Sequence, residues 1–173
     1  MRPFITALAL AATLSAPAFA EDKMSNDDAS AMKQVAQSSL NEIAAGKKGA
    51  EKAQSPDVKS FAQKMVDDHT KMFEDLRALA KTKGVALPQD ANMKDLAQMK
   101  MIERKSGAEF DKDYMEHMVK DHEKDLKDLE SLAAKVKDGE FKAALQKATP
   151  KIKEHLELAQ RLSKSAAAGS SSK

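Results

Sequence analysis

The stretch from Pro56 to Ala80, PDVKSFAQKMVDDHTKMFEDLRALA, indicates the fold class of this chain. Apolar side chains and one histidine recur in it at alternating steps of four and three residues. They are Val58, Ala62, Met65, His69, Met72, Leu76 and Leu79. This spacing makes one narrow stripe along an α-helix and favours left-handed packing against other helices at about 20°. The stretch therefore predicts one arm of an antiparallel helical bundle.

Two later segments carry the same stripe. The first comprises Met115, Met118, His122, Asp125, Leu129, Leu132 and Val136. The second comprises Phe141, Leu145, Ala148, Ile152, His155, Ala159 and Leu162. With a further helix expected upstream, four long helices can surround one core.

Capping residues predict where the first two helices begin and end. Ser25 or Asn26 can cap a first helix that runs through residue 54. Ser55 followed by Pro56 predicts the start of the second helix, because Pro suits the first helical position. Gly84 is expected to end that helix.

The second half of the chain is divided in the same way. A short helix is expected over residues 93–105, and Ser106 with Glu109 has the pattern of a capping box that opens a long helix to about residue 137. The last long helix is expected from Glu140, with a kink or re-capped break at Pro150. The predicted fold is all-α: an antiparallel four-helix bundle with an extra short helix before the third long helix.

The first twenty residues have the composition of a signal peptide. Arg2 supplies the positive charge, residues 4–17 supply the apolar run, and the small residues Ala18 and Ala20 suit cleavage after Ala20. No later run approaches the roughly 18 apolar residues of a membrane span. We therefore expect a signal peptide over 1–20, a periplasmic bundle domain over 21–164 and a disordered tail over 165–173.

Composition excludes several classes of function. Cysteine is absent, which excludes disulfides, thiolate catalysis and cysteine-ligated metals. Without residues 1–20, basic residues exceed acidic residues by one, and the two kinds alternate without basic blocks. The chain therefore lacks the charge pattern of a nucleic-acid-binding protein. A homo-oligomer or an envelope protein partner stays open.

An octet is repeated within the chain. MVDDHTKM at 65–72 is matched 53 residues later by MVKDHEKD at 118–125, and the match extends to residues 80 and 133. A duplicated helical hairpin would produce such a repeat. Convergence on one bundle pattern is the alternative, although amphipathicity alone does not require Asp-His at both stripes.

Four motifs together resemble a known bacterial family. FAQKMVDDHTKM at 61–72, KGVALP at 83–88, FDKDYMEHMVKDHEKD at 110–125 and ATPKIKEHLELA at 148–159 are similar to the domain of unknown function numbered 4142. The resemblance covers about residues 26–162 and implies an exported, ferritin-like four-helix bundle without an assigned activity. The paired Met and Asp-His motifs also look like a second exported ferritin-like family, number 305, in which Met-His-rich helices are associated with copper.

Three histidines are candidate metal ligands. His69, His122 and His155 occupy the predicted core stripes of three helices, and Met65 and Met118 stand one turn before the first two. Imidazole with thioether ligands suits copper or another transition metal, and Asp68 or Asp121 could orient an imidazole. The other interpretation is structural, since Met fills helical cores and a buried histidine often bonds a neighbouring helix.

The remaining candidates carry weaker signals. A di-iron oxidase needs Glu three residues before His, but Val66, Tyr114, Val119 and Ile152 occupy those positions. His117 is expected at the surface, and Glu42 is expected to be a capped or snorkelling side chain. No catalytic constellation is found. The sequence favours a non-enzymatic module that acts in stress or in binding and interaction. A periplasmic copper-type binding protein is the alternative, and a di-iron oxidase is the least favoured of the three.

Overall fold

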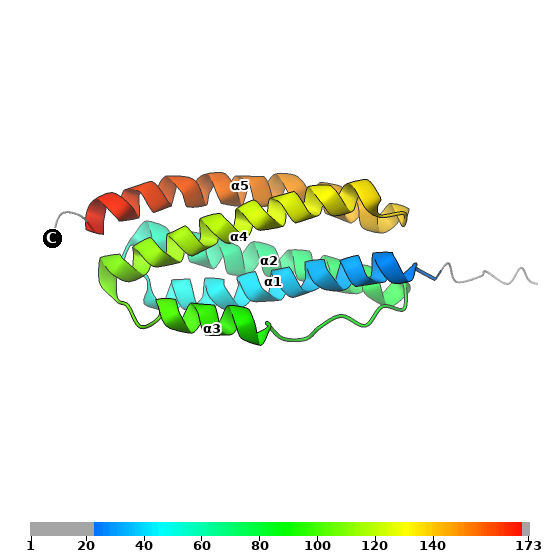
Figure 1. Ribbon diagram of the computed structural model, residues 1–173, viewed down its shortest axis with the longest axis horizontal. Coiled ribbons are helices and arrows are strands. Elements are labelled where there is room, and N and C mark those ends of the chain that lie inside the picture. The colour runs from blue at the N-terminus through cyan, green and yellow to red at the C-terminus, as the bar shows by residue number, and fades with distance from the viewer. Residues whose placement is uncertain (1–22, 171–173) are drawn as a thin grey trace, which may run out of the picture.

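Four long helices and one short helix form residues 23–170, the part of the chain that the computed structural model describes (Figure 1). They are α1 (Asn26–Lys52), α2 (Pro56–Thr82), α3 (Met93–Ile102), α4 (Gly107–Lys135) and α5 (Gly139–Ser170). The described residues contain no strand, so the all-α prediction is confirmed for them. None of these helices is long and apolar enough to cross a membrane. The predicted signal peptide lies outside the described residues.

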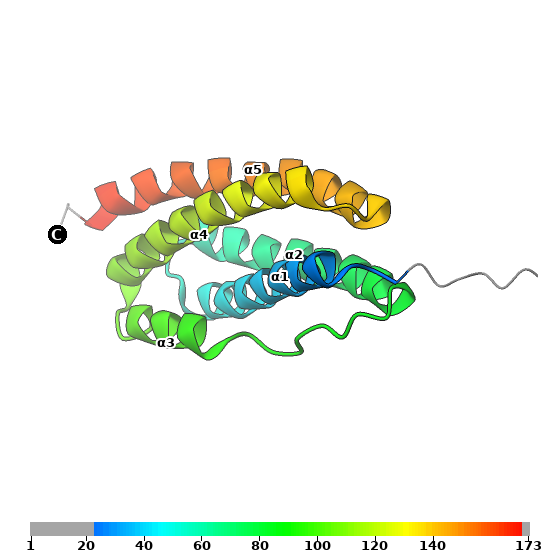
Figure 2. The ribbon, with the colours of Figure 1, turned by 45° about the vertical axis from the view of Figure 1, so that its right-hand side comes forward.

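The long helices pair as two hairpins. α1 packs along α2 and α4 packs along α5, while contacts of α2 with α5 and of α1 with α4 join the hairpins. Between them the chain returns along the bundle through residues 83–92 and α3, which lies beside α1 and α4 (Figures 1 and 2). Because of this return, α2 and α4 are diagonal neighbours that run in the same direction.

That arrangement bears on the repeated octet. The octet lies in α2, the second arm of one hairpin, and in α4, the first arm of the other. Copying a whole hairpin would instead match α1 with α4 and α2 with α5. The repeat therefore does not follow the order of the hairpins, but it places His69 and His122 at one level of two parallel helices.

Apolar side chains form two clusters, one toward each end of the bundle. The first contains Phe61, Ala62, Met65, Phe110, Tyr114, Met115, Met118 and Ala159. The second contains Met32, Ala36, Phe73, Leu76, Leu129, Phe141, Leu145 and Ile152. In each of α2, α4 and α5 the histidine stands between a residue of one cluster and a residue of the other. The core is therefore interrupted by one layer that contains three imidazoles.

Two aspartates hold the hairpin turns reciprocally. Asp111, on α4, accepts hydrogen bonds from the backbone N–H of Gln54 at 2.9 Å and of Ser55 at 2.7 Å in the turn between α1 and α2. Asp28, on α1, accepts from Lys137 at 3.1 Å and from the next residue, 138, at 2.8 Å in the turn between α4 and α5. Each hairpin thus satisfies the backbone donors of the other hairpin's turn.

Most predicted helix ends agree with the structure. Ser25 caps α1 by accepting from the Asp28 N–H at 3.1 Å. Gly84 follows the end of α2 with a φ of 66°, the left-handed conformation that suits glycine after a helix. The capping box at Ser106 is not formed, because the Ser106 side chain makes no capping hydrogen bond and Gly107 begins α4 with a φ of 61°.

The last helix is longer and more continuous than predicted. No break occurs at Pro150, which is exposed, since Leu145 and Ile152 on either side of it are buried in the same apolar cluster. The helix also continues through Ser170, whereas a disordered tail was predicted from residue 165. The alanines at 166–168 favour helix and account for this extension. Residues 171–173 lie outside the described part.

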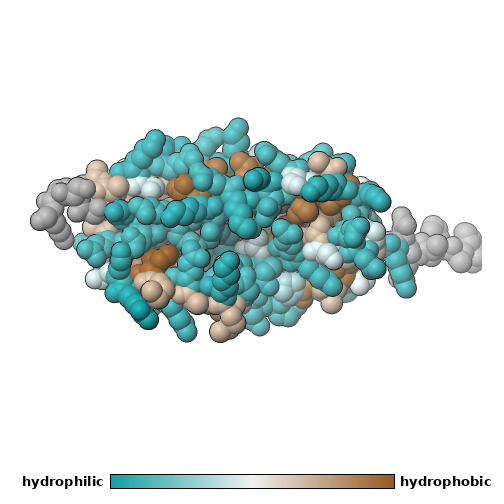
Figure 3. Space-filling model, in the orientation of Figure 1, coloured by the Kyte–Doolittle hydropathy of each residue, from teal (hydrophilic) through white to brown (hydrophobic). Residues whose placement is uncertain are grey.

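Charged side chains cover the outside of the bundle. Figure 3 shows hydrophilic residues over most of one face, with small separate apolar areas. Ion pairs at helical spacing, such as Lys71 with Asp75 and Lys124 with Asp128, occupy this surface. Such pairs are solvated and contribute little to stability individually. The unusual electrostatic features lie inside the bundle.

Candidate metal centre

Three imidazoles meet in the layer between the apolar clusters. His69 from α2, His122 from α4 and His155 from α5 have ring centroids 5.4 to 5.7 Å apart. One ring nitrogen of each lies within 4.8 Å of the others, and each residue is at most 2% exposed. Among the described residues this is the one group of potential ligands that converges in this way. The prediction that the three histidines face one core layer is confirmed.

A carboxylate fixes the first of these rings. His155 Nε2 donates a hydrogen bond to Asp68 Oδ2 at 2.8 Å, and His155 Nδ1 has no hydrogen-bond partner among the described residues. With the proton held on Nε2, the lone pair of Nδ1 is available to a ligand. Asp68 precedes His69 in sequence but binds the histidine of another helix. This is the arrangement in which a carboxylate orients a metal-binding imidazole.

The backbone fixes the second ring. His122 Nδ1 lies 2.9 Å from the carbonyl oxygen of Met118, one turn earlier in α4, and donates to it. His122 Nε2 has no partner among the described residues. The proton is again held on the nitrogen that is bonded, so the other nitrogen keeps its lone pair.

His69 differs from the other two. Neither of its ring nitrogens has a hydrogen-bond partner among the described residues, although the side chain is buried. A buried polar atom without a partner costs about 1–3 kcal/mol. Of the three rings, His69 therefore has the largest uncompensated cost of burial, which a bound ligand would reduce.

Burial keeps the three imidazoles neutral. It lowers the pKa of His69 well below the usual 6.5 and the pKa of His122 to about 4, and the neighbouring histidines add to both shifts. Burial also lowers the pKa of His155, although the bond to Asp68 acts in the opposite direction. Neutral imidazoles can donate lone pairs to a metal ion near neutral pH.

Glu42 brings a carboxylate to the edge of the layer from α1, the long helix that contributes no histidine to it. It lies on α1, is 3% exposed, and places Oε1 3.9 Å from His122 Nδ1. Its Oε2 is buried without a hydrogen-bond partner in the described structure. Burial first, and then Asp125 and Asp121, raise its pKa well above the usual 4.5. The predicted capped or snorkelling role is wrong. The side chain is buried and its Oε2 neither accepts a hydrogen bond nor reaches bulk solvent.

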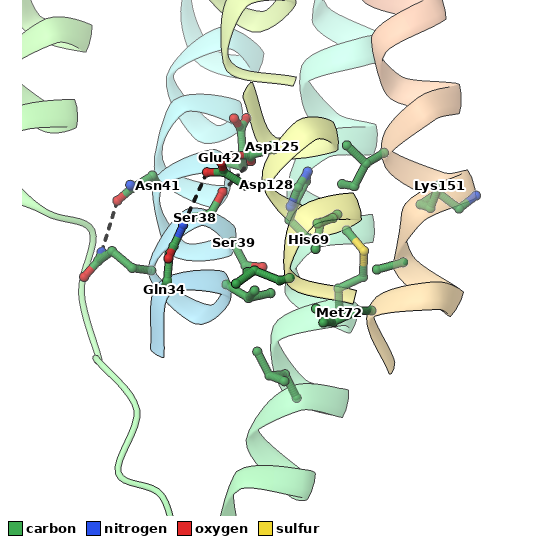
Figure 4. A pocket seen from close by; sticks show the side chains of 18 of the residues that line it. Gln34, Ser38, Ser39, Asn41, Glu42, His69, Met72, Asp125, Asp128 and Lys151 are labelled. Atoms are coloured by element: carbon green, nitrogen blue, oxygen red, sulfur yellow. Dashed lines mark hydrogen bonds between the residues drawn. The ribbon is translucent and has the colours of Figure 1, made fainter. Parts of the chain in front are cut away.

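A cavity of about 780 Å³ reaches this layer from one side (Figure 4). Its lining includes Glu42 and His69 but neither His122 nor His155. Asp68, Asp121 and Asp125 also line it. His69 and Glu42 are therefore the groups of the layer that a solute in the cavity meets first.

The comparison with protein families agrees with the resemblance found in the sequence. Residues 13–162 match the family described as Domain of unknown function (DUF4142). The chain belongs to this family. Comparisons with curated proteins and with solved structures give no significant match.

In this DUF4142 domain the two candidate thioether ligands lie beside the imidazole layer. Met65 and Met118 are fully buried in the apolar cluster that also contains Phe61 and Phe110. Both stand one turn before a histidine, and because α2 and α4 are parallel they lie on the same side of the layer. Their role as ligands stays a prediction.

The fourth histidine of the DUF4142 domain is not at the surface, contrary to the prediction. His117 is 4% exposed, with Nδ1 3.1 Å from the Gln98 side-chain amide of α3 and Nε2 3.2 Å from Asp121. The helical stripe alone could not show that α3 would cover this position. Asp121 thus pairs with His117 and not with His122.

Proposed function

We propose that this DUF4142 domain binds a transition metal ion through His69, His122 and His155. The observation that carries the proposal is the convergence of three buried, neutral imidazoles with one nitrogen each within 4.8 Å of the others. Two of the rings have their protons fixed on the nitrogens that face Asp68 and Met118. These bonds leave lone pairs free on the opposite sides of the rings.

To bind a metal ion, the three imidazole nitrogens need to move only slightly closer together. Metal–nitrogen bonds of about 2.0–2.1 Å hold three imidazole nitrogens roughly 3.4 Å apart. The largest present separation of 4.8 Å exceeds this by about 1.4 Å. Small rotations of the rings can supply that difference. The unpartnered His69 is the ring freest to rotate, since it gives up no hydrogen bond.

The energetic balance also supports a ligand. If the layer served packing alone, apolar side chains would fill it without the cost of unpartnered nitrogens. Four buried nitrogens of the three rings have no partner among the described residues. A metal ion bonds to three of them and offsets the cost of burying them.

The donor set narrows the choice of cation. Three neutral imidazoles suit borderline ions such as Zn²⁺, Cu²⁺, Ni²⁺ and Co²⁺. Cu⁺ is the second candidate, favoured by the position of Met65 and Met118 on one side of the layer. In that case the thioethers would replace water or a carboxylate as further ligands. Binding, not turnover, is the activity that we assign.

We also propose that the protein acts in the periplasm as a ferritin-like bundle. The signal-peptide pattern of residues 1–20 supports export. Two hairpins joined by a long connection support the ferritin-like assignment. Cell fractionation, with N-terminal sequencing of the purified protein, tests the export proposal. A mature chain that starts at Glu21 in the periplasmic fraction is the expected result.

Equilibrium dialysis of the chain from Glu21 onward tests metal binding. We expect one tightly held ion in the wild type and a loss of at least about a hundredfold in affinity in His69→Ala, His122→Ala and His155→Ala, since each loses a ligand. His117→Ala is the matched control, because His117 is also buried on α4 but lies outside the cluster. Equal and weak retention of Zn²⁺, Cu²⁺, Co²⁺ and Cu⁺ by all five proteins would exclude the site.

A further inference from the structure

The three imidazoles are enclosed, so an incoming ion needs a route. The cavity beside the layer is lined by residues of all four long helices and touches one imidazole, that of His69. His122 and His155 are not among the residues that line it. An ion that arrives through this cavity therefore meets His69 before it meets His122 or His155.

We propose that cations reach the metal centre through this cavity and that Glu42 passes them to His69. The inference rests on the proposed function, because it concerns access to the same three imidazoles. It assigns Glu42 the role of a transient carboxylate ligand on the path, which speeds association without belonging to the final coordination sphere.

The surroundings of Glu42 support this assignment. One carboxylate oxygen, Oε2, is buried at the cavity with no hydrogen-bond partner in the described structure. The other, Oε1, is 3.9 Å from His122 Nδ1, the nitrogen that already donates to the Met118 carbonyl. Glu42 thus stands at the protonated side of the His122 ring, while the free lone pair is on Nε2. This position is next to the centre without being inside it.

The charges of the cavity are graded by depth. Three of its five lysines, Lys71, Lys124 and Lys147, lie at the rim with side chains 68 to 81% exposed and are paired with aspartates, and Lys151 is 40% exposed. The carboxylates extend further inward, with Asp125 at 13% and Glu42 at 3% side-chain exposure. A cation that passes the paired rim therefore meets increasingly buried carboxyl groups.

Such a gradient acts on the rate of association. Carboxyl groups outnumber lysines in the lining by seven to five. An excess of one sign of charge between low-dielectric walls concentrates the opposite ion and can raise association rates by roughly 10- to 1000-fold. Oε2 of Glu42 has no hydrogen-bond partner in the described structure, so it can bind a cation without giving up a protein contact. Since a path residue accelerates binding and release alike, its removal should change the rate constants more than the affinity.

Stopped-flow mixing with Co²⁺ alone tests the proposal, because the visible bands of Co²⁺ report coordination by the imidazoles. The wild type is compared with Glu42→Gln, which keeps the size of the side chain. Glu51→Gln is the matched control, since Glu51 is an exposed residue of α1 outside the cavity. Asp125→Asn is a second variant along the same path, and thermal unfolding checks that every protein is folded.

We expect Glu42→Gln to bind Co²⁺ at least about tenfold more slowly, with a Kd within about threefold and an unchanged spectrum, and Glu51→Gln to match the wild type. Asp125→Asn should slow binding by about threefold and keeps the test informative if Glu42→Gln does not fold. Wild-type rates in both cavity variants would overturn the inference. So would a changed spectrum and a large loss of affinity in Glu42→Gln, which would make Glu42 a permanent ligand. A wild type that binds no metal would instead refute the proposed function.

Discussion

Asp68 of α2 and His155 of α5 are joined by a hydrogen bond of 2.8 Å that crosses between the two hairpins. Burial acts to raise the pKa of Asp68, but the hydrogen bonds from Lys64 and His155 outweigh it and lower the pKa. The carboxylate therefore stays ionised and makes the His155 ring a stronger donor toward a metal.

The first prediction concerns this bond. Asp68→Asn should weaken metal binding by about 10- to 100-fold, because the neutral amide polarises the imidazole less than a carboxylate does. Asp67→Asn is the control, since Asp67 accepts only from Gln63 at the surface. Competition titration against a chromophoric chelator measures both. Equal affinities in the two variants would show that Asp68 does not support the centre.

The second prediction separates a structural histidine from a ligand. In metal-free protein His69→Leu should unfold at the same temperature as the wild type or higher, because it removes two unpartnered buried nitrogens. Added Zn²⁺ should raise the Tm of the wild type only, since binding to the folded state stabilises it. Differential scanning calorimetry with and without Zn²⁺ measures both effects. A similar Zn²⁺-induced rise in the two proteins would contradict the ligand role.

The third prediction concerns acid stability of the metal-free protein. The folded-state pKa of His122 is about 4, below the 6.5 of an unperturbed histidine. Between these values the unfolded chain binds a proton that the folded protein does not bind, so stability falls as pH falls. The full effect of His122 approaches about 3 kcal/mol near pH 4 and is absent well above pH 6.5.

Urea unfolding at pH 7.5, 5.5 and 4.5 measures this effect by comparison with His122→Leu. The wild type should lose stability relative to the variant over that range. His69, His155, His117 and Glu42 remain in both proteins, so the difference reports the titration of His122 together with its coupling to these neighbours. A constant difference across the pH range would contradict the lowered pKa.

The fourth prediction concerns close packing of α1 against α4. A Cβ atom on Gly49 would lie 2.4 Å from Cζ of Tyr114 and 2.8 Å from Cβ of Ala62. Gly49→Ala should therefore destabilise the protein by about 1–3 kcal/mol, since the buried ring must shift. Gly139→Ala is the control, because its Cβ would meet nothing within 4 Å. Urea unfolding of the two variants should show a loss for Gly49→Ala alone.

The fold could be predicted from the sequence because its signals are local. Ser25 and Gly84 mark helix ends through bonds within their own helix. His69 and His122 share a stripe with apolar residues, and periodicity alone places such residues inward. The match in spacing between α2 and α4 was visible in the same way.

The partners of the site could not be predicted, because they come from other helices. The sequence places Asp68 about 100° around the helix from His69, and only the packing of α5 shows that it binds His155. Likewise α3 buries His117, and the approach of α4 leaves Glu42 enclosed without a hydrogen bond to Oε2. A periodic stripe identifies which face is inside but not which side chains meet there.

The reciprocal aspartates make each hairpin depend on the other. The turn after α1 has its N–H groups satisfied only when Asp111 of α4 is in place, and the turn after α4 only when Asp28 of α1 is in place. Neither helical pair is then an independent folding unit. Amide hydrogens at Ser55 and Asp138 should consequently have the same free energy of opening in deuterium exchange, that of global unfolding, although they belong to turns in different hairpins.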